Sequence, residues 1–401
     1  MDGSNLLRAQ SELVLTEARR QKAERTKNLG SPIELSGKAL DIQIQGNYAW
    51  ISENAHVARK IDLETGKTLQ IFRGHTAPVT CLAFCDRVHQ SNDNAFLITG
   101  SWDKSIKLWD TNTKEMISST SAHDDFVKTL LVISGANLLI SSSSDKTVRF
   151  WDISDIAESK SLTPVGSISA HTRPVETIYG ELNSDGTVIL FTADTMGIIK
   201  VWTLEKEADS RTRWRSTLKD TLNHHRTRVT ELQYGGGNIW TASSDETVQI
   251  VSYPPNDSSV KPHSPFIHPL PVRALLPLPL TDLREPYLIT GFGDVIRLYD
   301  ISSIDEPEIL GEIDGHWHDV TSLRLWMRTS KGEDGRTRIE PWVVSTSLDS
   351  TIRKWKLSDM LTPTPKTSQE PTSITSVSEV KGNGNWELTE EEERELAELM
   401  E

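Results

Sequence analysis

Residues 96–110 read FLITGSWDKSIKLWD, two short apolar runs on either side of a polar turn. Alternation of this kind is typical of antiparallel strands with one buried side. The frame returns as LLISSSSDKTVRFWD in residues 138–152 and as WVVSTSLDSTIRKWK in residues 342–356. The sequence therefore predicts a β-rich fold built from repeated hairpins that end in a tryptophan.

A histidine precedes each of these hairpins, and a valine follows the histidine four residues later. Six such pairs occur, at successive steps of 48, 48, 54, 43 and 48 residues. This period lies at or just above that of a four-stranded propeller blade and above most helical repeats. The six histidines are His75, His123, His171, His225, His268 and His316.

In these repeats, residues 31–358 resemble the WD-repeat β-propeller family. The resemblance implies an all-β fold, a seven-bladed propeller of four-stranded antiparallel blades. It also implies a hydrogen-bonded chain of four side chains inside each well-formed blade, in which an aspartate holds the histidine and a hydroxyl contacts the indole N–H. Matched by spacing, this network comprises His75, Thr99, Asp103 and Trp109 in blade two, His123, Ser141, Asp145 and Trp151 in blade three, and His316, Ser345, Asp349 and Trp355 in blade seven.

Histidine, serine and aspartate also form nucleophilic catalytic triads. A catalytic interpretation is disfavoured here because the same set repeats in several blades, whereas an active site is normally built once. We therefore expect no catalytic residues and no enzyme activity.

Three blades depart from this pattern. In blade four Met196 occupies the expected aspartate position, and in blade five Val251 replaces the tryptophan. In blade six the turn at Gly293 and Asp294 is one residue short, and Tyr299 replaces the tryptophan. We expect these blades to depend more on apolar packing and to loosen first.

A seventh blade is needed to close the ring, and residues 39–72 supply four strand-like runs with neither the histidine nor the tryptophan. Residues 32–36 then read as an outer strand of blade seven. Such pairing would join the start of the ring to its end and remove an exposed sheet edge.

The two ends of the chain differ from the ring. Residues 1–30 are a polar extension in which residues 11–27 favour a helix. Its basic residues could form a nuclear-import signal, but they are interrupted, and a solvated helix face is the better interpretation. Residues 359–385, rich in Pro, Thr, Ser and Gly, are expected to be a disordered linker.

Residues 386–401 favour a short acidic amphipathic helix, because Thr389 and Glu392 can form a capping box. Trp386, Leu396 and Leu399 would lie on its apolar side. The helix could bind a partner protein or its own propeller, and a merely solubilising tail is the simpler alternative.

The net charge of −14 disfavours direct nucleic-acid binding, although seven glutamates and one arginine in residues 390–401 supply −6 of it. We expect no membrane insertion and no secretory leader, since no apolar run is long enough. Cys81 and Cys85 would be packed thiols in a reducing compartment, with a two-ligand metal site as the weaker interpretation. A cytoplasmic or nuclear location follows.

Several apparent motifs do not indicate a site. The three glycines at 235–237 lie between strand-like runs without a following Gly-Lys-Ser/Thr, so they predict a hairpin and not a phosphate loop. The histidine pairs at 224–225 and 316–318 lack further ligands. We therefore expect neither a metal nor a cofactor.

Function must then come from the surface. The resemblance implies that loops after each blade histidine, and residues just before the turn aspartate, face the narrow end of the ring where partners commonly bind. In this chain those residues are Trp102, Phe126, Arg173, Arg226, Arg228, Trp317 and His318. Aromatic residues and arginines are enriched in interaction hot spots.

The sequence accordingly favours a non-enzymatic scaffold, a monomeric ring that binds other proteins through this end and the acidic helix and helps assemble a complex. The alternative is a substrate receptor of a ubiquitin ligase. Receptors of that kind often carry an arginine two residues after the Trp-Asp pair, whereas Trp109-Asp110 is followed by Thr111-Asn112. A propeller enzyme would need convergent carboxylates or metal ligands in the channel, and no such set can be named.

Overall fold

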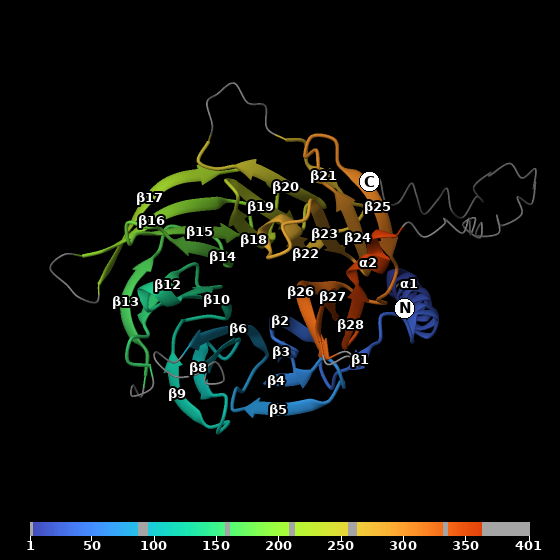
Figure 1. The fold of residues 1–401 in the computed structure, drawn as a ribbon, viewed down its shortest axis with the longest axis horizontal. Helices are drawn as coiled ribbons and strands as arrows, with labels where there is room; N and C mark the ends of the chain where they lie inside the picture. The colour runs from blue at the N-terminus through green and yellow to red at the C-terminus, as the bar shows by residue number, and fades with distance from the viewer. Residues whose placement is uncertain are drawn as a thin grey trace, which may run out of the picture. The chain divides into compact units, whose positions relative to one another are not determined.

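Seven four-stranded antiparallel sheets surround a central axis in the computed structural model (Figure 1), as the repeat predicts. The structure describes residues 3–86, 95–156, 161–207, 213–255, 263–331 and 336–362. Within these ranges no helix is both long and apolar enough to cross a membrane. The fold is thus a seven-bladed β-propeller with a helix at its N-terminus.

Blades one to four follow one another along the chain, each with its first strand nearest the axis and its fourth on the outside. Their strands are β2 (Ala39–Gln45), β3 (Tyr48–Glu53), β4 (Val57–Asp62) and β5 (Thr68–Arg73) in blade one; β6 (Val79–Asp86), β7 (Ala95–Ser101), β8 (Ser105–Asp110) and β9 (Met116–Ser121) in blade two; β10 (Val127–Ile133), β11 (Leu138–Ser143), β12 (Val148–Asp152) and β13 (Thr163–Ile168) in blade three; and β14 (Val175–Leu182), β15 (Val188–Asp194), β16 (Ile199–Lys206) and β17 (Trp214–Leu222) in blade four.

Blades five to seven continue the ring, and blade seven borrows its outer strand from the N-terminus. Their strands are β18 (Val229–Gly235), β19 (Asn238–Ser243), β20 (Thr247–Ser252) and β21 (Phe266–Ile267) in blade five; β22 (Val272–Pro277), β23 (Tyr287–Phe292), β24 (Val295–Asp300) and β25 (Glu308–Ile313) in blade six; and β26 (Val320–Lys331), β27 (Thr337–Ser347), β28 (Thr351–Lys356) and β1 (Ile33–Glu34) in blade seven. The helices are α1 (Gly3–Thr26) and α2 (Leu357–Leu361), with 3-10 turns at Ser134–Ala136 and Leu278–Leu280.

The repeated valine has a structural explanation. It opens the innermost strand of six blades, is fully buried each time, and is followed by a register shift of one residue, as between Val79 and Cys81. Ala39 and Asp41 repeat the shift in blade one. Such a bulge bends the strand and increases its twist. The valines therefore mark a repeated bend in the wall of the channel.

Second strands lie between two neighbouring blades, so both of their sides are covered. All six residues of β11 are buried, whereas most of the outer strand β17 is exposed or half-buried. Apolar clusters accordingly run from one blade into the next: Leu139 and Trp151 of blade three share a cluster with Ile98 and Leu108 of blade two. The core is a set of layers between blades.

The N-terminal strand closes the ring as the sequence predicts. Ile33 and Glu34 of β1 pair with Ile352 and Thr351 of β28. The backbone N–H of Leu35 continues this pairing with a 2.8 Å bond to the carbonyl of Ser350. Blade seven thus contains both ends of the propeller.

The terminal elements differ from the expected boundaries. Helix α1 begins at Gly3 and not near residue 11, and α2 occupies the first residues of the expected linker. Residues 363–401, which include the rest of that linker and the expected acidic helix, lie outside the described residues. The hairpin between β18 and β19 turns at Gly236 and Gly237, whose φ angles of 60° and 75° favour glycine.

Candidate functional site

Blade two brings together the four side chains that the sequence assigns to its network. The Nδ1 atom of His75 lies 2.8 Å from the Asp103 carboxylate, and Nε2 lies 2.7 Å from the Thr99 hydroxyl. The Trp109 indole donates to the same hydroxyl at 2.9 Å. Because a carboxylate only accepts, the proton is on Nδ1, and Nε2 accepts from Thr99.

Blades three and seven repeat this geometry with a serine in place of the threonine. The histidine–aspartate, histidine–serine and tryptophan–serine distances all lie at 2.8–2.9 Å, for His123, Asp145, Ser141 and Trp151 and for His316, Asp349, Ser345 and Trp355. The structure therefore unites all twelve of the assigned network residues.

Blade four also has a complete network, and the expectation that Met196 disrupts it is wrong. Asp194 supplies the carboxylate, 3.0 Å from Nδ1 of His171, and Thr192 and Trp202 complete the chain at 2.7 and 2.9 Å. Asp194 is the last residue of β15, two positions before Met196, whose side chain is 51% exposed. The spacing of the repeat did not identify Asp194, because this carboxylate comes from the end of the strand and not from the turn that follows it.

In blade five Val251 holds the tryptophan position, and a histidine from the loop before β18 contacts the threonine hydroxyl instead. His225 contacts Asp245 and Thr241 at 3.1 and 2.8 Å. The ring of His224 packs on that of His225, and its Nε2 lies 3.4 Å from the Thr241 hydroxyl. Burial lowers the pKa of His224 to about 4, so this ring remains neutral at pH 7. The Thr241 hydroxyl therefore still has a second nitrogen partner although Val251 replaces the tryptophan.

Blade six has a different network. The hydroxyls of Thr290 and Tyr299 lie 3.0 and 3.1 Å from Nε2 of His268. Buried Arg297 donates to the Tyr299 hydroxyl at 3.0 Å and pairs with Glu312 at 2.6 Å. Blade six thus also relies on a polar network, against the expectation that it depends on packing.

Blade one alone replaces the network by apolar residues. The strand registers place Ile51 at the position of Thr99 and Ile61 at the position of Trp109, and both are buried. Leu35 stands four residues before the start of β2, where other blades have histidine, and packs on the same cluster. Apolar packing therefore stabilises blade one at the positions where hydrogen bonds stabilise the other blades.

The blade networks cannot act as hydrolytic triads. Burial alone would raise the pKa of Asp349, but hydrogen bonds from His316 and Thr351 outweigh it and hold that pKa below its usual value. The hydroxyls of Thr99, Ser141 and Ser345 belong to residues with no exposed surface, and each already receives an indole N–H. A nucleophile must reach its substrate, so these groups serve the fold.

One backbone hydrogen bond recurs in all seven blades and defines an end of the ring. In blade two it runs from the N–H of Trp102 to the carbonyl of Pro78, and it joins the turn between the second and third strands to the loop before the first strand. We call the end formed by these turns and loops the top face. The equivalent donors in the other blades are Asn54, Ser144, Thr195, Ser244, Gly293 and Leu348.

Trp102 and Phe126, two of the expected partner-binding residues, lie together on the top face. Their rings stack across the boundary of blades two and three, with centroids 5.0 Å apart and an interplanar angle of 19°. They remain 40% and 37% exposed. Large aromatic rings are usually covered in a folded chain, so this exposed stack is the most distinctive feature of the top face.

The other expected residues occupy two further places. Arg228 lies 3.7 Å from Glu176, which also pairs with Lys128 at 3.3 Å. Arg173 is exposed in the loop before β14, the first strand of blade four. The backbone N–H of Arg226 bonds to the Asp245 carboxylate at 2.9 Å. In blade seven Trp317 and His318 are half-buried, with ring centroids 6.0 Å apart. Trp386, Leu396 and Leu399 lie outside the described residues.

The channel contains a charged cluster that the sequence does not reveal. Arg324 of blade seven lies 2.9 Å from Glu231 of blade five and 3.7 Å from Asp41 of blade one. The cluster lines a cavity of about 580 Å³. Burial raises the pKa values of Asp41 and Glu231, and the Arg324 charge opposes that rise. Arg324 of blade seven thus contacts blade five, which is not adjacent to it in the ring.

Each of these two carboxylates also accepts a backbone hydrogen bond from the next blade. Asp41 accepts the backbone N–H of Leu82 at 3.2 Å, and Gln43 donates to the carbonyl of the same residue at 2.7 Å. Glu231 and Gln233 bind Leu275 of blade six in the same way, at 2.7 and 3.1 Å. The matching signal in the sequence is an acidic residue and a glutamine two apart in β2 and β18.

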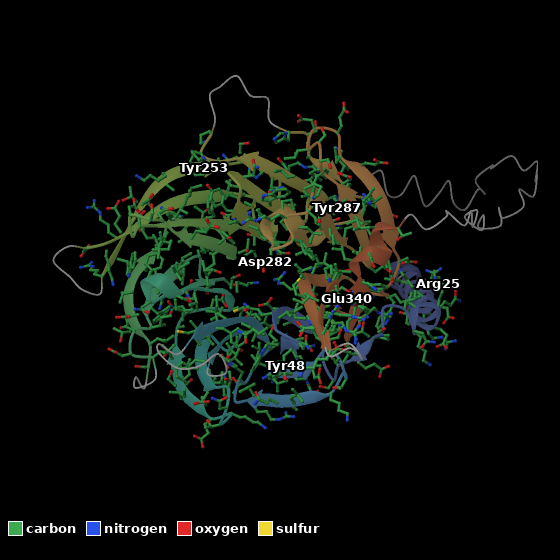
Figure 2. The ribbon with its side chains drawn as sticks, in the orientation of Figure 1. Arg25, Tyr48, Tyr253, Asp282, Tyr287 and Glu340 are labelled. Atoms are coloured by element: carbon green, nitrogen blue, oxygen red, sulfur yellow. The ribbon has the colours of Figure 1, made fainter. Side chains whose placement is uncertain are left out.

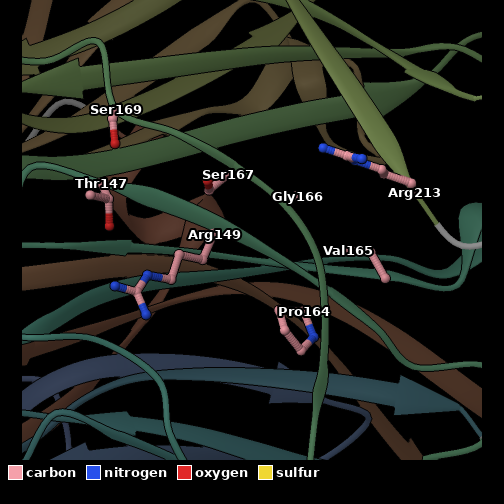
Figure 3. Close-up of a pocket in the computed structure, with 8 residues that line it drawn as sticks. All are labelled: Thr147, Arg149, Pro164, Val165, Gly166, Ser167, Ser169 and Arg213. Atoms are coloured by element: carbon pink, nitrogen blue, oxygen red, sulfur yellow. The ribbon is translucent and has the colours of Figure 1, made fainter.

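A second hollow lies at the rim of blade three (Figure 3). It has a volume of about 560 Å³, and its guanidinium groups come from Arg149 and Arg213. Arg149 already donates to the carbonyl of Ala122 at 2.9 Å and pairs with Asp124 at 3.2 Å. Arg149 therefore joins the rim hollow to the loop before β10, which also carries Phe126 of the top face.

The described residues contain no group of three metal-ligating side chains. Cys81 and Cys85 are both buried in β6, and burial raises the pKa of the Cys81 thiol. A protonated, enclosed thiol is a poor metal ligand.

Comparison with known proteins points to the repeat. The family model for the WD domain, G-beta repeat, matches residues 66–110 and 114–152. An uncharacterized WD repeat-containing protein of Schizosaccharomyces pombe is 27% identical over 402 residues, which span 97% of this chain and 96% of that protein. Nuclear distribution protein PAC1 of Coccidioides posadasii is 28% identical over 157 residues, 32% of this chain and 33% of that protein. Cell division control protein 4 of Saccharomyces cerevisiae is 40% identical over 82 residues, 20% of this chain and 9% of that protein.

Proposed function

Because this chain is a WD-repeat β-propeller, we propose that it is a non-enzymatic scaffold that docks other proteins on its top face and helps assemble a multiprotein complex. Propellers of this family typically act as interaction scaffolds. The polar groups that could suggest catalysis are enclosed within the blades, so the accessible chemistry is that of a binding surface.

The exposed stack of Trp102 and Phe126 carries this proposal. Two aromatic rings held face to face present a rigid apolar surface whose removal from water favours binding. The backbone N–H of Trp102 donates one of the recurring bonds and the carbonyl of Phe126 accepts another, so the surface is preorganised. Arg173, Arg226 and Arg228 would add charged contacts in blades four and five.

The test is to measure partner recovery after the change Trp102→Ala in the full-length chain. We expect the recovered amount of at least one partner to fall, with little change in melting temperature, because surface changes usually have small effects on stability. Tyr48→Ala is the matched control, since Tyr48 is 39% exposed and is the first residue of β3, at the end of blade one away from the top face. Its position is labelled in Figure 2.

The paired change Arg226→Glu and Arg228→Glu gives a second measurement on the same face. Reversing two charges should weaken an electrostatic contact more than truncating one side chain. If every partner is recovered unchanged after both experiments, partners do not dock on this part of the top face and the proposal is wrong.

The acidic segment 386–401 remains a second proposed contact, which binds a partner protein in trans. Its support is the sequence alone, with Trp386, Leu396 and Leu399 on one side of an acidic helix. Deleting residues 386–401 should remove one partner at an unchanged melting temperature. A lower melting temperature with all partners retained would instead indicate an intramolecular contact.

A further inference from the structure

Blade three has an outer strand with one unpaired edge. Strand β13 pairs with β12 on one side only, from Thr163 opposite Asp152 to Ile168 opposite Val148. Among the described residues, no hydrogen bond joins the other edge of β13 to a strand, a loop or a side chain. The backbone N–H and C=O groups of such an edge can pair with an added strand.

Strand β13 also lacks the usual protection of an exposed edge. Outer strands commonly avoid pairing with other chains by being short or by carrying charged side chains. Strands β1 and β21 have two residues each, and β5, β17 and β25 contain charged residues. Strands β9 and β13 have neither form of protection. Pro164 removes one donor from β13 and leaves residues 165–168 able to pair.

Blades two and three differ in how the third strand covers this edge. In blade two Lys107 lies opposite Ser119 of β9, and its Nζ donates to the Ser119 hydroxyl at 2.7 Å. The equivalent residue of blade three is Arg149, opposite Ser167 of β13. Its guanidinium instead donates to the carbonyl of Ala122, in the loop before β10. The charged side chain of β12 therefore leaves the edge of β13 uncovered.

The rim hollow runs along this uncovered edge (Figure 3). Gly166, Ser167 and Ser169 of its lining have small side chains, and both serines are exposed. Small side chains on a strand allow another backbone to approach closely. The hollow thus has room for a further strand beside β13.

Arginines stand on both sides of the edge. Arg149 shares a face of blade three with Trp151, which packs towards blade two. Arg213 directly precedes Trp214, which packs in the cluster between blades three and four. Figure 3 shows the two arginines on either side of the strand that carries Gly166. Among the described residues that line the hollow there is no carboxylate.

The arginines do have carboxylate neighbours outside the lining. Arg149 lies 3.2 Å from Asp124, whose side chain is 89% exposed, and Arg213 lies 3.8 Å from Glu207. Exposed pairs of this kind contribute little to stability because water screens them. A guanidinium has five N–H donors, so it can bind a second carboxylate without losing the first.

We propose that the free edge of β13 and the rim hollow bind an acidic, extended segment of a partner protein, which adds to blade three as a fifth strand. This surface goes beyond the scaffold proposal, because it lies on the outer rim and does not include the Trp102–Phe126 stack.

The geometry of an added strand determines the chemistry of the segment. Successive side chains of a strand point to opposite faces of its sheet. Adjacent acidic residues in the segment would therefore face Arg149 on one side and Arg213 on the other. A basic segment would bring like charges together, which opposes binding.

The test uses fluorescent peptides of about eight residues, the length of an ordinary strand, rich in threonine and valine with adjacent glutamates at the centre. A companion peptide carries lysines in place of the glutamates. Fluorescence anisotropy with the full-length chain should show roughly tenfold tighter binding of the acidic peptide. Added salt should reduce that affinity.

A third peptide separates strand pairing from charge attraction. It keeps the glutamates but carries N-methyl groups on its central amides, so it has the same charge and cannot donate backbone hydrogen bonds to β13. It should bind at least about tenfold more weakly than the unmethylated acidic peptide. Equal affinity of these two peptides would show that no strand is added.

Two pairs of variants locate the binding on blade three. Arg213→Glu should weaken binding roughly tenfold, whereas Arg215→Glu, the same change outside the hollow on β17, should leave it unchanged. Ser167→Glu places a carboxylate at the edge of β13 and should also weaken binding. Thr217→Glu on β17 is its control. All four residues are exposed, so the melting temperatures should change little.

Hydrogen exchange separates this proposal from docking on the top face. Binding of the acidic peptide should slow amide exchange in β13, and Trp102→Ala should not change its affinity. Protection around Trp102 and Phe126 instead would overturn the β13 surface and support docking at the aromatic stack. Each of the two surfaces can therefore fail without the other.

The remaining outcomes also decide the proposal. Equal affinity for the acidic and basic peptides, or no binding of either, would overturn it. Tighter binding after deletion of residues 386–401 would show that this chain's own acidic segment occupies the edge. A dimer in sedimentation that Arg213→Glu abolishes would show that a second copy does, and either result would overturn the assignment to a partner protein.

Discussion

A carboxylate can reach the blade histidine from two positions in the chain. Asp103 stands in the turn after β7, whereas Asp194 is the last residue of β15, and both accept from Nδ1 of their histidine at 2.8–3.0 Å. Asp194 also accepts the backbone N–H of Met196, which fixes the turn that follows. The hydrogen-bonded geometry is thus kept while its position in the sequence changes.

The change Asp194→Ala should therefore cost about 1–3 kcal/mol, since buried His171 would lose its acceptor. Met196→Ala should stay within about 0.5 kcal/mol, because that side chain is half exposed and outside the network. Urea unfolding of both variants gives the comparison. Equal losses would mean that Asp194 does not hold the histidine.

The histidines of blades five and six make stability depend on pH. Burial lowers the pKa of His224 and His268 to about 4, against 6.5 for an ordinary histidine. Between these values the unfolded chain binds protons that the folded chain does not, so stability falls as pH falls from 6.5 to 4. Each histidine would contribute about 3 kcal/mol to that loss.

Melting temperatures measured across this range should show the decline, and His268→Gln should make it shallower by removing one titrating group. His56→Gln alters an exposed histidine and should leave the slope unchanged. A variant at His268 with the slope of the unaltered chain would contradict the assignment. The network aspartates affect stability at lower pH than the histidines do. The pKa of Asp349 is depressed, so the stability that its ionised form contributes is lost only as pH falls below the ordinary carboxyl range.

Among the described strands, β1 and β21 are the shortest, and β1 pairs with residues at the opposite end of the propeller sequence. Strand β1 has two residues, yet its pairing with β28 joins Ile33 to Ile352 and closes the ring. The pattern of residues 32–36 predicts this strand because it alternates and has no other partner. The pattern does not predict the start of α1 at Gly3, since the first residues of a helix are weakly specified without a cap.

Ile33→Ala should cost about 2–5 kcal/mol, because Ile33 is 7% exposed and packs in the cluster between blades one and seven. Ile267→Ala is the matched control, a change in the equally short strand β21 at a side chain that is 73% exposed. Thermal unfolding should separate the two variants. Similar melting temperatures would indicate that β1 does not hold the ring closed.

At the scale of the whole propeller, neighbouring blades are joined by packing, and the channel adds contacts that pass between blades. Thr80, Thr129, Thr230 and Thr321 each donate from one blade to a carbonyl of the next, at 2.7–3.1 Å. Arg324 instead links blade seven to blades five and one. The cross-channel contact thus opposes opening of the ring.

Arg324→Met should destabilise the propeller at pH 7, by about 1–3 kcal/mol after allowance for channel water, because it leaves Asp41 and Glu231 without their cation. Both carboxyl pKa values are already raised by burial. Protonation removes the uncompensated charge, so the deficit relative to the unaltered chain should shrink as pH falls toward 5. A deficit that is constant with pH would show that packing, and not charge, is lost.

The sequence by itself determined the repeat, the order of the blades and the closing strand, and its resemblance to the WD-repeat family implied the networks of blades two, three and seven. These features are local or periodic: a strand has a period of two, and each blade repeats its histidine and tryptophan at similar distances. Any single match would be weak, but the repetition fixes the architecture.

Only the tertiary structure decided what fills the irregular positions. His224 takes the place of an indole, Tyr299 and Arg297 rebuild blade six, and Asp194 replaces a turn aspartate. Tyr299 stands at the tryptophan position itself, whereas His224 and Asp194 come from positions that the repeat does not predict. A hydrogen bond requires an atom at the right point in space and not at a fixed sequence distance. Three further contacts join residues that only the closed ring brings together. They are the stack of Trp102 on Phe126, the ion pairs of Arg324 across the channel, and the ion pairs of α1 with Asp294 and Asp314.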